Sequence, residues 1–163
     1  MTDHVDLAMS QWASVLPGVD VSPMAVIGRL ARVTRLIDVE LRRTFASHGL
    51  DAASFDVLAT LRRNGRALTA GELMSSAMVT SGAITQRLDK LENEGLVIRR
   101  SSADDGRRVV VELTDAGLAR IDETLPDHLA TETRLLGMLS PEEQGILALS
   151  LKGLLQSLEP VRD

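Results

Sequence analysis

Apolar residues recur at intervals of three or four along most of this chain, a spacing that predicts a mainly helical protein. Over residues 24–48 they form one face of a long amphipathic helix, made up of Val26, Leu30, Val33, Ile37 and Leu41. Ser22 and Pro23 are residue types that cap a helix and occupy its first turn, and Gly49 follows its last residue. We therefore expect Ser22 to cap this helix. An additional short helix is expected over residues 5–15.

A helix-turn-helix is predicted after a further helix over residues 52–63. Thr69 and Glu72 form a capping box, in which each side chain accepts a hydrogen bond from a backbone amide at the helix start. This box opens a short helix, after which the chain turns. Thr80 or Ser81 is the expected cap of the next helix, whose buried stripe consists of Ile84, Leu88 and Leu91.

Alternating apolar and polar residues then replace the helical spacing. Gly95 is the expected left-handed residue at the helix end. Residues 97–101 and 109–113 alternate as two strands do, and the Asp-Asp-Gly turn at 104–106 joins them. From residue 68 to residue 114 the predicted order is therefore helix, turn, helix and β-hairpin. This order is typical of a winged helix-turn-helix, which places one helix in the major groove of DNA.

The C-terminal third is helical again, beginning near Asp115. Ser140 and Glu143 form a second capping box, with Pro141 in the first turn of the final helix. The apolar surface of that helix is too wide to pack on one side only. A second copy is the simplest partner for it, so we expect a homodimer. The residues concerned are Ile146, Leu147, Leu149, Leu151, Leu154, Leu155 and Leu158.

These elements predict a mainly α fold with a small β-wing. The expected architecture is a winged helix-turn-helix flanked by N- and C-terminal dimerisation helices. We expect residues 1–48 to form the N-terminal helices, 49–114 the DNA-binding domain and 115–163 the C-terminal dimerisation helices. The 44% content of hydrophobic residues is ordinary for a globular protein.

The composition argues against catalysis and against a metal site. The chain has no cysteine, and His4, His48 and His128 are scattered without the spacing of metal ligands. Neither a phosphate-binding glycine loop nor a Ser–His–Asp arrangement is recognisable. We therefore expect no enzyme, no metal and no cofactor. An acidic N-terminus and the lack of an apolar run of ~20 residues predict a cytoplasmic protein with no membrane segment.

The net charge of −5 is unevenly distributed along the chain. Residues 1–28 hold three acidic residues and no Lys or Arg, and residues 114–163 hold 4 basic and 9 acidic residues. Residues 29–113 therefore hold 14 basic against 11 acidic residues. This basic excess coincides with the winged helix, which fits a double-stranded DNA partner. The scarcity of aromatic residues argues against base stacking with single strands or RNA.

The outward face of the second helix of the motif is the predicted DNA reader. Its small and polar side chains can approach base edges and phosphates, although a merely solvated face remains the alternative. At the hairpin tip, Asp105 and Arg107 flank a glycine and Arg108 follows. Such a tip suits a minor groove, and an ordinary charged turn is the alternative. The predicted contacts from the helix are Thr80, Ser81, Gly82, Thr85, Gln86 and Lys90.

The motifs of this segment resemble the multiple-antibiotic-resistance regulator (MarR) family. They are L-T-x-x-E-L from residue 68, R-L-x-x-L-E-x-x-G-L-V from residue 87, and D-x-R followed by V-x-L-T at the wing. The resemblance covers about residues 23–158. It implies a dimeric regulator, by analogy a repressor, that reads an inverted repeat and is released by a small-molecule effector. Gly106 stands where the family often has a second arginine, which weakens one expected phosphate contact.

A finer resemblance is to the urate-responsive branch of this family. It depends on a tryptophan near the N-terminus, the sequence Phe-Asp-Val-Leu at 55–58, and arginines in the reading helix and at the start of the wing. An indole suits a planar ring, guanidinium groups suit its negative charge, and a carboxylate would be repelled by it. The resemblance implies that urate or a related anionic purine binds among Trp12, Asp56, Arg87 and Arg99.

Several alternatives remain open at this point. Trp12 could simply anchor the additional helix, and Asp56 could form structural ion pairs with Arg87 or Arg99. The effector could instead be a phenolic carboxylate or a drug-like compound, as in other branches of the family. From a different class, the winged helix could be a protein-interaction module without a role on DNA.

Overall fold

The computed structural model describes residues 2–76, 84–102 and 108–159. Helices dominate this part of the chain, and three strands form one antiparallel sheet. The predicted mainly α fold with a small wing is therefore confirmed. The elements are α1 His4–Val15, α2 Pro23–Ser47, α3 Ala52–Asn64, β1 Leu68–Thr69, α4 Ala70–Ser76, α5 Ile84–Asn93, β2 Val97–Ser101, β3 Val109–Leu113, α6 Asp115–Leu136 and α7 Pro141–Leu158.

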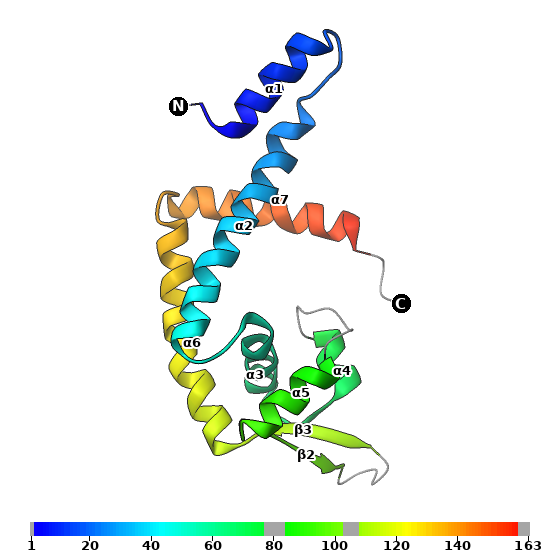
Figure 1. Cartoon of the computed structure of the whole chain (residues 1–163), viewed down its shortest axis with the longest axis vertical. Coiled ribbons are helices and arrows are strands. Elements are labelled where there is room, and N and C mark those ends of the chain that lie inside the picture. Colours follow the sequence, from blue (N-terminus) through cyan, green and yellow to red (C-terminus); the bar gives the residue numbers. More distant parts are fainter. Residues whose placement is uncertain (1, 77–83, 103–107, 160–163) are drawn as a thin grey trace.

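Two long helices, α2 and α6, pack side by side and connect the two ends of the molecule (Figure 1). At one end α3, α4, α5 and the sheet form a winged-helix lobe. At the opposite end α1 lies against the beginning of α2, and α7 projects sideways from the end of α6. The elements predicted to read DNA are therefore grouped at one end, and α1 lies far from them within one chain.

The winged-helix lobe contains most of the buried core. The predicted stripe of α5 is confirmed, since Ile84, Leu88 and Leu91 are all buried. Burying each such side chain contributes about 1.5–3 kcal/mol relative to leaving it exposed. This stripe fixes which face of α5 turns outward. Its neighbours in the same core cluster include Val57, Leu58, Leu73 and Ile121.

The small sheet has the strand order β1-β3-β2. Its pairs are antiparallel, with Leu68 opposite Val111 and Val97 opposite Leu113. The strands over 97–101 and 109–113 agree with the prediction. The strand β1 was not predicted, because two residues are too few to show the alternation that marks a strand.

Both predicted capping boxes are present. The amide of Thr69 donates to Glu72 Oε2 at 2.7 Å, and the amide of Glu72 donates to Thr69 Oγ1 at 3.2 Å. Ser140 and Glu143 make the same reciprocal pair at the start of α7. Gly95 has a φ of 70°, which confirms the left-handed residue expected after α5.

The predicted cap at Ser22 is wrong. Its backbone is helical (φ −55°, ψ −34°), and its side chain makes no capping hydrogen bond. A capping residue needs extended backbone so that its side chain can reach the free amides of the first turn. Asp20 accepts a hydrogen bond from the Ser22 amide instead, at 2.9 Å. Pro23 does occupy the first turn of α2, as predicted.

The additional N-terminal helix is confirmed as α1. Val5 is buried against Gly28 of α2, where an added Cβ would lie 3.2 Å from the valine side chain. Arg29 of α2 donates to Asp3 at 2.8 Å and to Asp6 at 2.6 Å. An apolar contact and a forked ion pair thus fix α1 on α2.

Candidate DNA interface and effector cavity

The outward face of α5 is polar and exposed. Thr85 and Gln86, both predicted to contact DNA, are exposed, as are Asp89 and Asn93. Lys90 is only half-buried, and it is engaged by a carboxylate of another helix. The other predicted contacts lie outside the described residues, namely Thr80, Ser81 and Gly82.

The wing places further cations beside α5. Arg108 is exposed at the start of β3. Arg100 of β2 pairs across the hairpin with Glu112 of β3, with 2.8 Å between Nε and Oε1. Asp105 and Arg107, the other two predicted wing contacts, lie outside the described residues.

One flank of α5 is held by the first residue before α3. Asp51 caps α3 through its Oδ1 atom, which accepts the Ser54 amide at 2.9 Å. Its Oδ2 atom accepts hydrogen bonds from Arg87 at 2.6 Å and from Lys90 at 2.8 Å. Arg87 also lies 3.5 Å from the Ser54 hydroxyl. One carboxylate therefore joins the start of α3 to two cations of the reading helix.

The surroundings of Asp51 favour its charged form. Partial burial acts to raise the pKa of this carboxyl, but three groups outweigh it. These are the hydrogen bond from Lys90, the Ser54 amide and the positive charge of Arg87. Together they lower the pKa of Asp51 from 3.8 to about 2. Asp51 is therefore ionised throughout the physiological range.

The other flank of α5 is held by Arg99 of β2. Its guanidinium pairs with Asp89 at 2.6 Å and with Glu92 at 3.1 Å. Its backbone amide also donates to Glu92, at 3.0 Å. At 100° per residue, positions 89 and 92 lie on the side of the buried stripe opposite to positions 87 and 90. Arg87 and Arg99 thus hold opposite flanks of α5, each with its own carboxylate partners.

A large cavity opens between α2, α3 and α6, with a volume of about 780 Å³. The rings of Phe45 and Phe55 stack with centroids 4.4 Å apart, and the His128 ring lies 4.7 Å from that of Phe55. Leu41, Ile121, Leu125 and Leu129 complete the apolar part of the wall. The arrangement provides an aromatic wall suited to a planar molecule.

Of the four predicted effector residues, Asp56 lies in this cavity wall. Arg87 and Arg99 are not among its described lining residues, and they are engaged on the flanks of α5. Trp12 is 46% exposed on α1, at the far end of the molecule. A single chain therefore does not gather the four residues around one volume.

The charged groups around the cavity are mixed. Arg62 and Arg63 line it together with four carboxylates, and Arg62 is already paired with Asp122 at 2.7 Å. On the aromatic wall, His128 Nδ1 is buried and has no hydrogen-bond partner among the described residues. The other ring nitrogen, Nε2, lies 3.3 Å from Glu132. The four carboxylates are those of Asp38, Asp56, Asp122 and Glu132.

Sequence reasoning missed the aromatic wall of this cavity. Phe45 and Phe55 are the only phenylalanines in the chain, and they are two of its three aromatic residues. The signal in the sequence was their position, because two phenylalanines ten residues apart, on successive predicted helices, can face one another when the helices pack. His128 lies 73 positions beyond Phe55, so its part in the wall depends on how α6 packs on α3.

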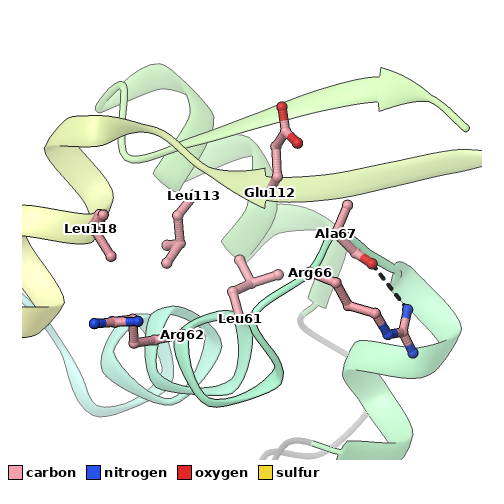
Figure 2. A pocket seen from close by; sticks show the side chains of 8 residues that line it. Leu61, Arg62, Arg66, Ala67, Glu112, Leu113 and Leu118 are labelled. Carbon is pink, nitrogen blue, oxygen red and sulfur yellow. Dashed lines mark hydrogen bonds between the residues drawn. The ribbon is translucent and has the colours of Figure 1, made fainter. Parts of the chain in front are cut away.

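A smaller pocket of about 270 Å³ lies between α3, β3 and the start of α6 (Figure 2). Its charged side chains already have protein partners. Arg62 pairs with Asp122, Arg66 with Glu72 and Glu112 with Arg100. Arg66 also donates to the carbonyl of Ala67 (Figure 2). This pocket is therefore smaller than the aromatic cavity, and its charged groups are already engaged by protein partners.

The described residues, 2–76, 84–102 and 108–159, contain no group of three His, Asp or Glu side chains placed to hold a metal ion. Within the same residues, no helix has the length and apolar character required to cross a bilayer.

Comparison with known proteins identifies the family. A MarR-family model matches residues 48–108. The regulator PecS of Dickeya dadantii is 39% identical over 138 residues, which are 83% of this chain and 83% of PecS. The repressor YetL of Bacillus subtilis is 27% identical over 156 residues, covering 95% of this chain and 93% of YetL.

Solved structures agree with this assignment. A mutant MarR from E. coli in complex with operator DNA has a TM-score of 0.71 and 28% identity, covering 88% of this chain and 97% of that one. Bordetella bronchiseptica BpsR, whose DNA binding is regulated by 6-hydroxynicotinic acid, shares the fold. Its TM-score is 0.77 at 23% identity, covering 88% of this chain and all of BpsR. The chain belongs to the MarR family of winged-helix transcription regulators, which bind DNA.

Proposed function

We propose that this protein is a homodimeric repressor that reads an inverted-repeat operator and is released by a planar aromatic effector, urate being the first compound to test. The aromatic cavity between α2, α3 and α6 carries the proposal. It has one wall on α3, the helix whose capping residue also holds the reading helix α5. A ligand that displaces α3 would therefore also displace the reading helix.

The proposed dimer is supported by the uncovered apolar surface of the helices outside the lobe. No residue of α7 is buried, although the helix carries seven large apolar residues. On α2, Val26, Ile27 and Leu36 are also more than half exposed. Burying such surface gains about 25 cal/mol per Å². A second copy would cover these faces and create the two-fold symmetry that matches an inverted repeat.

The proposed DNA contact uses two copies of α5. Their outward faces would enter successive major grooves on one side of the duplex, about one helical turn or ~34 Å apart. The residues proposed for this contact are Thr80, Ser81, Gly82, Thr85, Gln86 and Lys90 of the helix with Asp105, Arg107 and Arg108 of the wing. As proposed boundaries, residues 49–114 read DNA, and residues 1–48 and 115–163 dimerise.

The proposed release depends on α3. A negatively charged effector in the cavity would repel Asp56 and displace the first turn of α3, where Asp51 holds Arg87. A coupling of about 1–3 kcal/mol would change operator affinity by roughly 5–150-fold. Because Trp12 lies far from the cavity of its own chain, the four-residue urate site needs the Trp12 of a second protomer. Arg87 and Arg99 would also have to leave their present carboxylate partners.

A second effector class is favoured by the cavity lining itself. The described wall is mainly apolar and aromatic, and it holds four carboxylates against two arginines. Such a lining suits a phenolic or drug-like compound with little negative charge better than it suits a urate anion. The regulation of BpsR by 6-hydroxynicotinic acid shows that a planar acid acts on one protein of this fold.

A DNA-binding assay decides between these effectors. The probe is the duplex upstream of the protein's own gene, and the titrants are urate, salicylate and a neutral phenol. Release by urate alone supports the purine effector, and release by the neutral phenol supports the second class. Release by salicylate, a monoanion like urate, would show that the carboxylates of the wall do not exclude an anion. An inverted repeat within the protected sequence is expected in either case. Failure of all three to weaken binding would contradict the proposed effector site.

A further inference from the structure

The contact between Asp51 and Lys90 brings together groups that DNA binding would separate. Lys90 lies on the reading helix, and its ammonium group is 2.8 Å from Asp51 Oδ2. Asp51 belongs to the start of α3, 39 positions earlier in the chain. A lysine on a helix that enters the major groove lies close to the phosphates at the groove edge. The carboxylate and the phosphates therefore compete for one cation.

We propose that Asp51 limits the DNA affinity of this protein by holding Lys90 in an ion pair that competes with a DNA phosphate, so that each protomer makes one phosphate contact fewer than it could. The proposal rests on the proposed contact of α5 with DNA and not on any effector. Asp51 is then a positioning residue. It changes DNA binding through Lys90 and does not itself contact the DNA.

Arg87 and Lys90 share one oxygen of Asp51, and Lys90 is the one of the two that can leave. Arg87 contacts the same Oδ2 atom at 2.6 Å, and only 23% of its side chain is exposed. The Lys90 side chain is 40% exposed. When Lys90 leaves, Arg87 and the Ser54 amide still neutralise and cap Asp51. The loss of one exposed ion pair therefore leaves no unpaired buried charge.

The chemistry of lysine fits such an exchange. Its ammonium group is a point charge on a flexible four-carbon stem, so it can turn from a carboxylate to a phosphate without moving the helix backbone. The planar guanidinium of Arg87 is more tightly constrained, because its side chain is largely buried and its Nη1 atom contacts both Asp51 and Ser54. Arg87 thus anchors the helix while Lys90 exchanges partners.

Asp51→Asn is the direct test, because asparagine caps a helix as well as aspartate does. The variant keeps the Ser54 hydrogen bond and loses the charge that holds both Lys90 and Arg87. The probe is a mixed-sequence duplex of ~30 base pairs, long enough for both reading helices. Phosphate contacts are independent of sequence, so the operator need not be known. Asp51→Ser, a second neutral cap, serves if the first variant does not fold.

The readout is the slope of log K against log salt. One additional phosphate contact per protomer changes this slope by about −0.9. The ratio of variant affinity to parent affinity should then be larger at ~50 mM salt than at ~200 mM salt. The difference is about 3.5-fold for each additional contact. A variant that binds more weakly than the parent, or one with an unchanged slope, overturns the proposal.

Two controls separate this effect from a general change of charge. Asp122→Asn alters the net charge equally and removes a different ion pair of α3, that of Arg62 with Asp122. It should reproduce neither the tighter binding nor the steeper slope. In a Lys90→Gln background, Asp51→Asn removes only the contact with Arg87, so neither the tighter binding nor the steeper slope should appear. An equal gain in that background would show that Asp51 does not act through Lys90.

Discussion

Gly117, in the first turn of α6, lies directly against the backbone of Leu96. An added Cβ at Gly117 would stand 1.9 Å from the Leu96 carbonyl oxygen. That same oxygen accepts a hydrogen bond from the Thr114 amide at 3.1 Å. Glycine is thus required at the point where α6 leaves the winged-helix lobe, and this close approach sets the direction of α6 relative to β2.

Gly117→Ala should therefore destabilise the protein by about 1–3 kcal/mol or more, because a backbone atom must move to admit the methyl group. Denaturant unfolding measures this change. Gly71→Ala in α4 is the matched control, since among the described residues its Cβ would meet only Thr69 Oγ1, at 4.0 Å. There alanine should stabilise the helix by a few tenths to 1 kcal/mol. Equal effects at the two positions would contradict the close contact.

Glu72 predicts a dependence of stability on acid. The Thr69 amide, Arg66 and the Thr69 hydroxyl lower the pKa of Glu72 from 4.5 to about 2. A lowered pKa contributes stability that is fully present above pH ~4.5 and is lost as the pH falls towards ~2. Glu72→Gln keeps the capping box but cannot titrate. The parent should lose more stability than this variant between ~pH 6 and ~pH 3 in unfolding measurements. Parallel losses would show that Glu72 is not held in its charged form.

These two sites also show which parts of the fold could be predicted from sequence. The capping box of Thr69 and Glu72 spans four consecutive residues, so its pattern is complete in the sequence. The contact of Gly117 with Leu96 joins residues 21 positions apart, and Arg87 meets Asp51 across 36 positions. No local pattern specifies such partners. The sequence therefore predicts the helices and the wing, but it does not predict which carboxylate each arginine meets or which rings line the cavity.

Arg99 should link the wing to the reading helix. Arg99→Gln removes the ion pairs with Asp89 and Glu92, which are partly exposed, so the stability loss should stay within about 1 kcal/mol. The loss in the free energy of DNA binding should be larger than this loss of stability, because β2 no longer fixes the flank of α5. Arg99→Lys keeps the positive charge but lacks the forked guanidinium that contacts two carboxylates. Its DNA affinity should lie between that of the parent and that of Arg99→Gln. Arg42→Gln, which removes a highly exposed pair with Asp38, is the control and should bind DNA like the parent.

The apolar surface of α7 should prove essential for assembly. Leu154→Glu places a charge in the middle of that surface, whereas Lys152→Glu changes a charge at a position between the apolar residues that already carries one. The first variant should shift the protein from dimer towards monomer in sedimentation experiments, because an unpaired charge would be buried in the interface. The second should sediment like the parent. A dimer that tolerates Leu154→Glu would remove α7 from the proposed interface.

Asp56 and Trp12 test the effector site independently of DNA recognition. Neither belongs to the proposed DNA contact, so Asp56→Asn and Trp12→Ala should leave operator affinity largely intact. If urate acts by repelling Asp56, the neutral variant should show a blunted release. Loss of the indole should weaken urate binding itself, which calorimetry measures apart from DNA release. Glu123→Gln, an exposed carboxylate outside the described cavity lining, is the matched control. Full release by urate in both variants would show that the effector acts elsewhere, because neither the repelled carboxylate nor the stacking ring would then contribute.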